Sequence, residues 1–125
     1  MYSLTVNGNT PSKKNSRISM IHGGKIINIP SNRYRAWHKP ALQTLKNTPV
    51  RFEKTECVDL CFYGENKRKF DLSNRAESIM DLLVDAGIIP DDNYEIVPRL
   101  DIKYGGVSKE NPRCEVIIYG KEIQC

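Results

Sequence analysis

The amino-acid sequence predicts an α+β fold, in which two main helices cover one mixed β-sheet. Segments of alternating apolar residues and segments of helical periodicity follow one another in the order strands, helix, strand, helix, two strands. A length of 125 residues with 39% hydrophobic and 27% charged residues is typical of a single globular domain, here residues 1–125. The sequence contains no internal repeat or low-complexity segment.

The first thirty residues predict a strand, a basic loop and a hairpin. Tyr2–Val6 alternates as a strand does, and the turn-forming residues 7–9 end it. The loop Thr10–Arg17 combines hydroxyls, an amide and three basic side chains, a set that suits phosphate oxygens. A solvated loop has the same composition and is more common. Gly23 and Gly24 then separate two short apolar segments, as in a hairpin.

A first helix is expected over Arg33–Lys46, with Ser31 placed to cap its N-terminus. The apolar residues of its buried side are Trp37, Ala41, Leu42 and Leu45. Pro40 falls inside this segment. Because proline lacks an amide proton and its ring crowds the preceding turn, we expect it to kink the helix or to divide it in two.

Three further strands are expected in the second half of the chain. Val58–Gly64 alternates apolar and polar residues, which predicts a strand with one buried face. Ile96–Tyr104 alternates in the same way, and Pro98 indicates an edge or a bulge. Gly105–Gly106 opens a loop, and Cys114–Tyr119 forms the last strand.

The segment Lys67–Asp92 contains the second helix, around which the remainder of the chain is organised. Its apolar residues repeat at helical spacing, at Leu72, Ala76, Ile79, Met80, Leu83 and Val84. Asp71 or Ser73 can cap the N-terminus, Gly87 can close the last turn, and Pro90 prevents continuation. These signals predict a helix from about Ser73 to Ala86.

The side of this helix opposite the apolar stripe is polar and acidic. It carries Asn74, Glu77, Ser78, Asp81 and Asp85, with Asp71 before the helix and Asp91 and Asp92 in the turn after it. Mg²⁺ prefers oxygen ligands and keeps several waters, so a few carboxylates suffice to hold it. Bound Mg²⁺ activates water and stabilises charge on a phosphate. Taken alone, the pattern also describes a solvated helix face.

Charge is divided unevenly along the chain. Residues 1–69 contain 13 Lys and Arg against 4 Asp and Glu, whereas residues 70–125 contain 6 against 11, which together give the net charge of +4. A basic half that frames an acidic cluster suits a polyanion held against a metal site. Mutual neutralisation of the two halves is the alternative.

Other features exclude several classes of protein. The sequence has no run of 18 apolar residues and no charged-then-apolar N-terminus, so we expect no membrane span, no signal peptide and a cytoplasmic location. Four cysteines, without a CxxC pair or a neighbouring histidine, favour reduced and mostly buried thiols over a disulfide or zinc site.

Two segments resemble a known family. KFDLSNRAESIMDLLVDAGIIPDDNYEIV, residues Lys69–Val97, is similar to the signature of the RusA-type Holliday junction resolvases, endodeoxyribonucleases common in phages and prophages. PSKKNSR, residues Pro11–Arg17, resembles the opening loop of that family. Together they cover about a third of the chain. The resemblance implies a RusA-like fold and a homodimer that cuts paired strands at a four-way DNA junction in recombination, repair or phage DNA processing.

The resemblance also implies roles for individual residues. Asp71 matches the first family aspartate, and Asp92, with Asp91 beside it, matches the essential acid of the second pair. Mg²⁺, with Mn²⁺ as an alternative, is the implied cofactor, and no small-molecule cofactor is expected. The supporting residues of this metal site are Ser73, Asn74 and Asp81.

The sequence departs from the family pattern at two positions. Ser73 occupies the position of the second aspartate in the best-known version of the family motif, D-x-D-N. Glu77 occupies a position where the family often has a lysine. Because residues four apart leave a helix on the same face, Glu77 is expected to replace the missing carboxylate as a catalytic metal ligand. If Glu77 instead pairs with Lys67 or Arg75, the site is weakened or inactive.

Basic residues on both sides of this site predict contacts with DNA phosphates. The expected DNA-binding residues are Lys13, Lys14, Asn15, Arg17, Lys67, Arg68, Lys69 and Arg75. Two other hypotheses remain at this stage. One is a structure-selective DNA-binding protein that is catalytically weak or inactive, and the other is an interaction protein whose acidic helix binds a basic partner.

Overall fold

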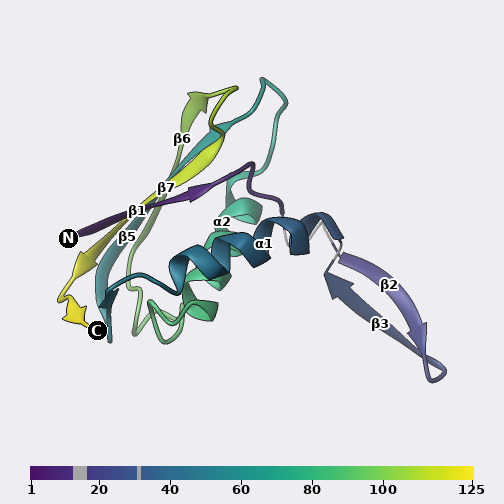
Figure 1. The fold of residues 1–125 in the computed structure, drawn as a ribbon, viewed down its shortest axis with the longest axis horizontal. Helices are drawn as coiled ribbons and strands as arrows, with labels where there is room; N and C mark the ends of the chain where they lie inside the picture. The colour runs from purple at the N-terminus through teal and green to yellow at the C-terminus, as the bar shows by residue number, and fades with distance from the viewer. Residues whose placement is uncertain (13–16, 31) are drawn as a thin grey trace.

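The computed structural model describes residues 1–12, 17–30 and 32–125, and at 17–22 and 25–30 it describes the backbone alone. Two helices and a mixed sheet confirm the α+β prediction (Figure 1). The elements are β1 (Tyr2–Asn7), β2 (Arg17–His22), β3 (Lys25–Pro30), α1 (Asn32–Leu45), β4 (Val50–Arg51), β5 (Thr55–Gly64), α2 (Leu72–Asp85), β6 (Leu100–Val107), β7 (Arg113–Gly120) and β8 (Ile123–Gln124).

The main sheet has the strand order β1-β7-β5-β6. β1 and β5 both pair antiparallel with β7, whereas β5 and β6 are parallel and are connected through α2. Both helices lie on one side of this sheet (Figure 1). The chain leaves β5 at Gly64 and begins α2 at Leu72. The basic residues 67–69 therefore lie between the end of β5 and the start of α2.

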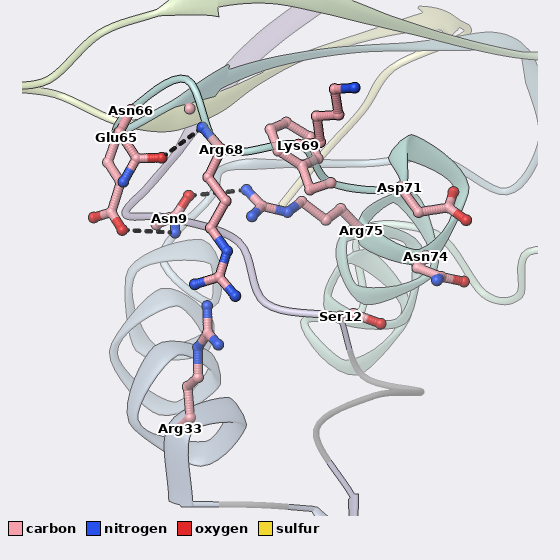
Figure 2. A pocket seen from close by; sticks show the side chains of 12 residues that line it. Asn9, Ser12, Arg33, Glu65, Asn66, Arg68, Lys69, Asp71, Asn74 and Arg75 are labelled. Carbon is pink, nitrogen blue, oxygen red and sulfur yellow. Dashed lines mark hydrogen bonds between the residues drawn. The ribbon is translucent and has the colours of Figure 1, made fainter.

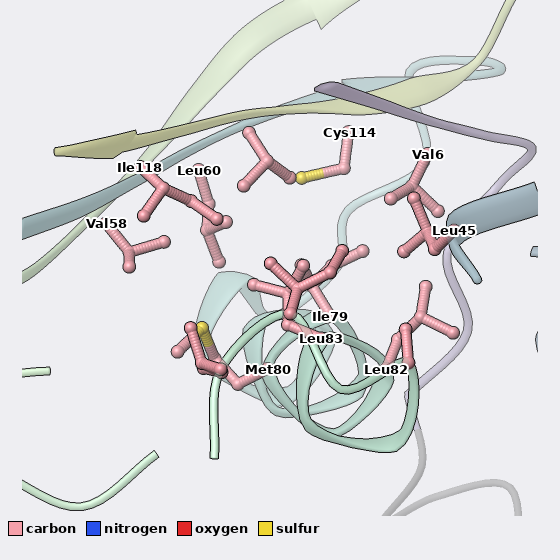
Figure 3. Packing of buried hydrophobic residues seen from close by; sticks show 14 of the residues in the cluster. Val6, Leu45, Val58, Leu60, Ile79, Met80, Leu82, Leu83, Cys114 and Ile118 are labelled. Atoms are coloured by element: carbon pink, nitrogen blue, oxygen red, sulfur yellow. The ribbon is translucent and has the colours of Figure 1, made fainter. Parts of the chain in front are cut away.

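The core forms between α2 and the inner face of the sheet. Val58, Leu60 and Phe62 of β5 are buried, in the predicted alternation. Figure 3 shows Ile79 and Leu83 of α2 facing Val58 and Leu60. The α2 stripe is wider than the sequence indicates, because Leu82 is fully buried as well. Burial of apolar surface at about 25 cal/mol per Å² makes this contact the main stabilising feature of the fold.

The expected ends of α2 are confirmed with small shifts. Asp71 is its N-cap, and the helix begins at Leu72 rather than Ser73. At the other end Gly87 has a φ of 73°, a left-handed conformation that favours glycine, and its amide donates to the Val84 carbonyl oxygen at 2.9 Å. The cap and the glycine thus fix the length of the helix that carries most of the predicted acids.

α1 is not divided at Pro40, which excludes one of the two expected outcomes, a kink or a division. α1 runs without interruption from Asn32 to Leu45. Tyr34, Trp37 and Leu45 are buried on either side of the proline and anchor both halves of α1 in the core. Pro40 itself is exposed, so the carbonyl group that loses its helical partner lies on the side of the helix that water reaches.

The expected strand Ile96–Tyr104 is also shifted. β6 begins at Leu100, because Ile96 and Val97 lie in a turn whose amides donate to the Asn93 carbonyl oxygen at 3.1 and 2.8 Å. Gly105–Gly106, expected to open a loop, lies inside β6.

A β-bulge explains the position of this glycine pair. The pairing register shifts between Phe62 and Tyr63, so that Tyr63 pairs with Gly106 and Gly105 is left out. A Cβ atom on Gly105 would lie 2.6 Å from the Tyr63 ring, which is closer than real contacts allow. Glycine at position 105 therefore leaves room for the Tyr63 ring against β6, and it does not reverse the chain.

The remaining strands form two small sheets. β2 and β3 form the expected hairpin around Gly23 and Gly24, and in Figure 1 it extends away from the main sheet beyond the start of α1. The two-residue strands β4 and β8 pair with each other and were not predicted. Among the described residues, no helix is both long and apolar enough to cross a membrane.

Candidate functional site

The first predicted metal ligand, Asp71, is also a structural residue. Its Oδ1 atom accepts hydrogen bonds from the Ser73 amide at 3.0 Å and from the Ser73 hydroxyl at 2.7 Å. One of these bonds satisfies a free amide in the first turn of α2. Ser73, in the position where the family aspartate is absent, therefore contacts Asp71 directly and holds its carboxylate at the start of the helix.

The polar side of α2 is less uniform than the sequence indicates. Asn74 and Asp81 are half-buried and Glu77 is exposed, but Ser78, expected on this polar side, is fully buried. The Ser78 hydroxyl donates to the Pro11 carbonyl oxygen at 2.7 Å. The start of the Thr10–Arg17 loop thus lies against the middle of α2, and this contact explains why a polar residue is buried there.

Glu77 makes no ion pair within residues 1–12, 17–30 and 32–125, apart from the hairpin side chains that are not described. Arg75, the partner considered in the alternative, instead donates from Nη1 to the Asn9 Oδ1 atom at 2.8 Å. Lys67 is exposed. The exposed carboxylate of Glu77 therefore keeps its charge directed to solvent at the surface of α2.

Asp91 and Asp92 lie in a tight turn after α2. Both carboxylate oxygens of Asp91 accept hydrogen bonds, from the Asp92 amide at 2.7 Å and the Asn93 side chain at 3.0 Å, and these bonds lower the pKa of Asp91. The pKa of Asp92 is raised, first by partial burial, then by its hydrogen bond with Asp91 and by the negative charges of Asp81 and Asp91. Asp81, Asp91 and Asp92 thus form one acidic group at the C-terminal end of the site.

The predicted metal residues therefore fall into two places. Asp71, Ser73 and Asn74 lie at the start of α2, whereas Asp81 is ten residues further along, a rise of about 15 Å. Within the described part of the chain, no three of the predicted acids bring their ligand atoms within 4.8 Å of one another.

A different cluster does meet that spacing. Cys57, Asp59 and Asp101 each offer a ligand atom within 4.8 Å of the others and could hold a metal ion. They lie on the outer face of the sheet, where Asp59 and Asp101 are paired across β5 and β6. Sequence reasoning missed this cluster because it joins residues more than forty positions apart, and only the strand register places them together.

The chemistry of this second cluster is unlike that of the predicted site. Burial, the hydrogen bond from Cys57 Sγ to Asp59 at 3.3 Å, and the nearby carboxylates raise the pKa of the Cys57 thiol to about 11. Arg99 forms an ion pair with Asp101 at 3.2 Å. Because thiolate rather than thiol ligates metals, a cation that bound this cluster through Cys57 would have to displace the thiol proton. All four cysteines are free, as expected, although only Cys114 is fully buried.

The predicted basic residues before α2 line a pocket of about 300 Å³ (Figure 2). Arg68, Lys69 and Arg75 contribute to it, as do Asp71 and Asn74 from the metal site. The structure adds residues that were not among the predicted site residues, and these include Asn9, Ser12, Arg33, Glu65, Asn66 and Phe70. Of these residues Arg33 has a signal in the sequence, because it lies among the basic residues Arg33, Arg35 and Lys39 of α1.

Four of the predicted DNA-binding residues have no described side chain. Lys13, Lys14 and Asn15 lie outside the described residues, and of Arg17 the structure describes the backbone as the first residue of β2. The pocket nevertheless brings together four cations from two distant segments, next to two of the predicted metal-site residues.

Comparisons with known proteins add no relative. No protein-family model matches the chain, and no curated protein matches it significantly in sequence.

Proposed function

We propose that this protein is a Mg²⁺-dependent, structure-selective endodeoxyribonuclease of the RusA type, which resolves four-way DNA junctions by paired nicks. The observation that carries the proposal is the arrangement along α2. A pocket with four cations lies at its N-terminus, and the acidic group Asp81, Asp91 and Asp92 lies at its C-terminal end. A DNA strand that runs along α2 would meet phosphate-binding cations at one end and carboxylates that can hold a metal at the other.

The acidic group fits Mg²⁺ by its chemistry. All its donors are carboxylate oxygens, which Mg²⁺ prefers, and Asp92 has a raised pKa that reflects in part the repulsion from Asp81 and Asp91. A bound cation would remove that repulsion. In the proposed site Asp92 and Asp91 hold the metal with support from Asp81 and from Glu77, which lies one helical turn before Asp81. Asp71, about 15 Å from Asp81 along α2, is the proposed ligand at the other end of the site, beside the basic pocket. Mn²⁺, with similar oxygen ligands, is the expected substitute.

The remaining groups have roles in binding. When bound, Mg²⁺ would supply an activated water and stabilise charge on the scissile phosphate. Ser73 keeps Asp71 oriented through the 2.7 Å hydrogen bond, and Arg68, Lys69 and Arg75 neutralise phosphates of the DNA arms. Two symmetric nicks require two sites, so we infer a homodimer acting on DNA in the cytoplasm.

A second candidate is a junction-binding protein without cleavage. The separation of Asp71 from Asp81 along α2 favours it, since no three of the predicted acids in the described residues bring their ligand atoms within 4.8 Å of one another. This candidate retains the basic pocket and the preference for branched DNA, but not the metal-dependent step.

The test is cleavage of a synthetic four-way junction and of linear duplex with the same arms, in Mg²⁺ and in EDTA. We expect paired nicks in the junction alone, only with metal, and a loss of about a hundredfold or more in rate for Asp92→Asn. Tight junction binding with no cleavage by the wild type would favour the second candidate. Equal indifference to both substrates would remove both.

Asp101→Asn is the matched control, because it removes one carboxylate from the Cys57 cluster instead. Full activity is expected for this variant. If Asp101→Asn abolished cleavage while Asp92→Asn did not, the metal would belong to the outer face of the sheet and the proposed site would be wrong.

A further inference from the structure

We propose that Arg33, Arg68 and Arg75 form a binding site for one phosphate of the DNA backbone, immediately beside the start of α2. The inference rests on the proposed nuclease function and deepens it, because it places one phosphate of the DNA strand at defined residues and adds Arg33 as a DNA-binding residue. The three guanidinium groups come from α1, from the segment before α2 and from α2 itself.

Arg75 is the fixed member of this site. Its guanidinium lies 3.6 Å from the centroid of the Phe70 ring and donates to Asn9 Oδ1 at 2.8 Å. Asn9 in turn donates to Glu65 at 3.3 Å. These contacts hold Arg75 half-buried in one orientation, and a guanidinium that is already ordered loses little freedom when it binds a phosphate.

Arg33 and Arg68 complete the site from above and below. Their exposed side chains point toward each other in Figure 2, although like charges repel. Neither guanidinium makes an ion pair with a carboxylate among the described residues. Arg33 is close enough to Arg75 to lower its pKa, after the larger effect of burial. A group of like charges that exceeds its counter-charges is costly unless an anion joins it.

The carboxylates of the same pocket neutralise only part of this positive charge. Asp71 accepts hydrogen bonds from Ser73, and in Figure 2 its carboxylate points away from the arginines. Glu65 lies behind Asn9 and balances one positive charge. A volume of about 300 Å³ accommodates a phosphate with part of its sugar, and guanidinium groups bind phosphate oxygens through paired hydrogen bonds.

Junction binding in EDTA tests the proposal without cleavage. Arg33→Gln is compared with Arg35→Gln, which removes the same charge from the same helix but outside the pocket, where Arg35 donates to Asn32 at 3.0 Å. We expect Arg33→Gln to weaken junction binding about tenfold and to reduce the salt dependence by about one phosphate contact. Arg35→Gln should change binding less than about twofold.

Melting without DNA separates binding from a structural role. Removing Arg33 relieves repulsion, so its variant should melt at the same temperature as the wild type or higher, and a lower melting temperature would overturn the proposal. Inorganic phosphate is the second probe. If it stabilised the wild type but not Arg33→Gln, while both bound the junction equally, the pocket would serve a free phosphate instead of DNA.

The outcomes also separate this inference from the proposed function. If the wild type cleaves junctions and Arg33→Gln binds them as tightly as the wild type does, the phosphate-binding site is wrong and the proposed function stands. An Arg33→Gln variant that binds weakly but cleaves in Mg²⁺ at saturating protein would support the phosphate-binding site and keep the acids as the catalytic groups. A wild type that neither binds nor cleaves junctions would overturn both.

Discussion

At the scale of single residues, Asp71 combines two tasks that a substitution can separate. Its Oδ1 atom caps α2 through Ser73, and its charge belongs to the proposed metal site. Asn accepts the same cap hydrogen bonds, whereas Ala removes them at a cost of about 1 kcal/mol. Asp71→Asn is therefore the informative variant, because it removes the charge and keeps the helix end.

Cys57 provides a prediction that depends on protonation alone. With a pKa of about 11, about one Cys57 thiol in a thousand is ionised at pH 8, so alkylation should be slow. Asp59→Asn removes a charge that favours the protonated thiol, and we expect alkylation about threefold faster or more. The measurement is peptide-resolved labelling with iodoacetamide.

This experiment has two controls, a second cysteine and a second variant. The exposed Cys125 is an internal reference for reagent activity in the same sample. Asp85→Asn, which removes a carboxylate bonded to His38 on the other side of the sheet, should leave Cys57 labelling unchanged. An equal acceleration in both variants would show that Asp59 does not control the thiol.

At the scale of elements, α2 shows what periodicity predicts and what it misses. Spacing alone predicts the apolar stripe through Ile79 and Leu83, and capping chemistry predicts both ends. Ser78 escaped prediction because its environment comes from Pro11, a residue in a distant loop. The division of α1 expected at Pro40 does not occur for a similar reason, because tertiary packing of Trp37 and Leu45 stabilises the helix on both sides of the proline.

The candidate site was predictable to a different degree. Asp91, Asp92 and the cations at 67–69 lie within the single segment Lys67–Asp92. They were predicted from its composition and from its resemblance to the RusA-type signature. Arg33 joins the pocket from 35 residues upstream of Arg68, and Asp59 meets Asp101 through strand register. Such pairs depend on how elements pack, which local sequence does not encode.

The Ser78 contact predicts coupling between the N-terminal loop and α2. Ser78→Ala leaves the Pro11 carbonyl group without its 2.7 Å donor in a buried place, so we expect a loss of about 1–3 kcal/mol in the free energy of unfolding. Urea denaturation measures it. Thr44→Ala is the control, because its hydroxyl bonds to the Pro40 carbonyl oxygen on an exposed helix face and should cost much less. Equal losses would contradict a special role for Ser78.

At the scale of the whole molecule, the basic first half predicts a strong salt dependence of DNA binding. If six or more of its cations contact phosphates, junction affinity should fall about a thousandfold between 50 and 200 mM salt. Fluorescence anisotropy in EDTA measures this for the junction and for linear duplex. A flat response would contradict phosphate contacts as the source of affinity, whatever the preference for branched DNA.

The pairing of β1 with β7 has a consequence for how the protein is made. Tyr2 lies opposite Ile118 and Asn7 opposite Arg113. β1 can therefore form its backbone hydrogen bonds only after a strand more than one hundred residues later has been synthesised. β7 also lies between β1 and β5 in the sheet. During synthesis the ribosome must therefore release nearly the whole domain before the sheet closes. Until then β1 and β5 remain exposed on the nascent chain, where chaperones are the expected first partners.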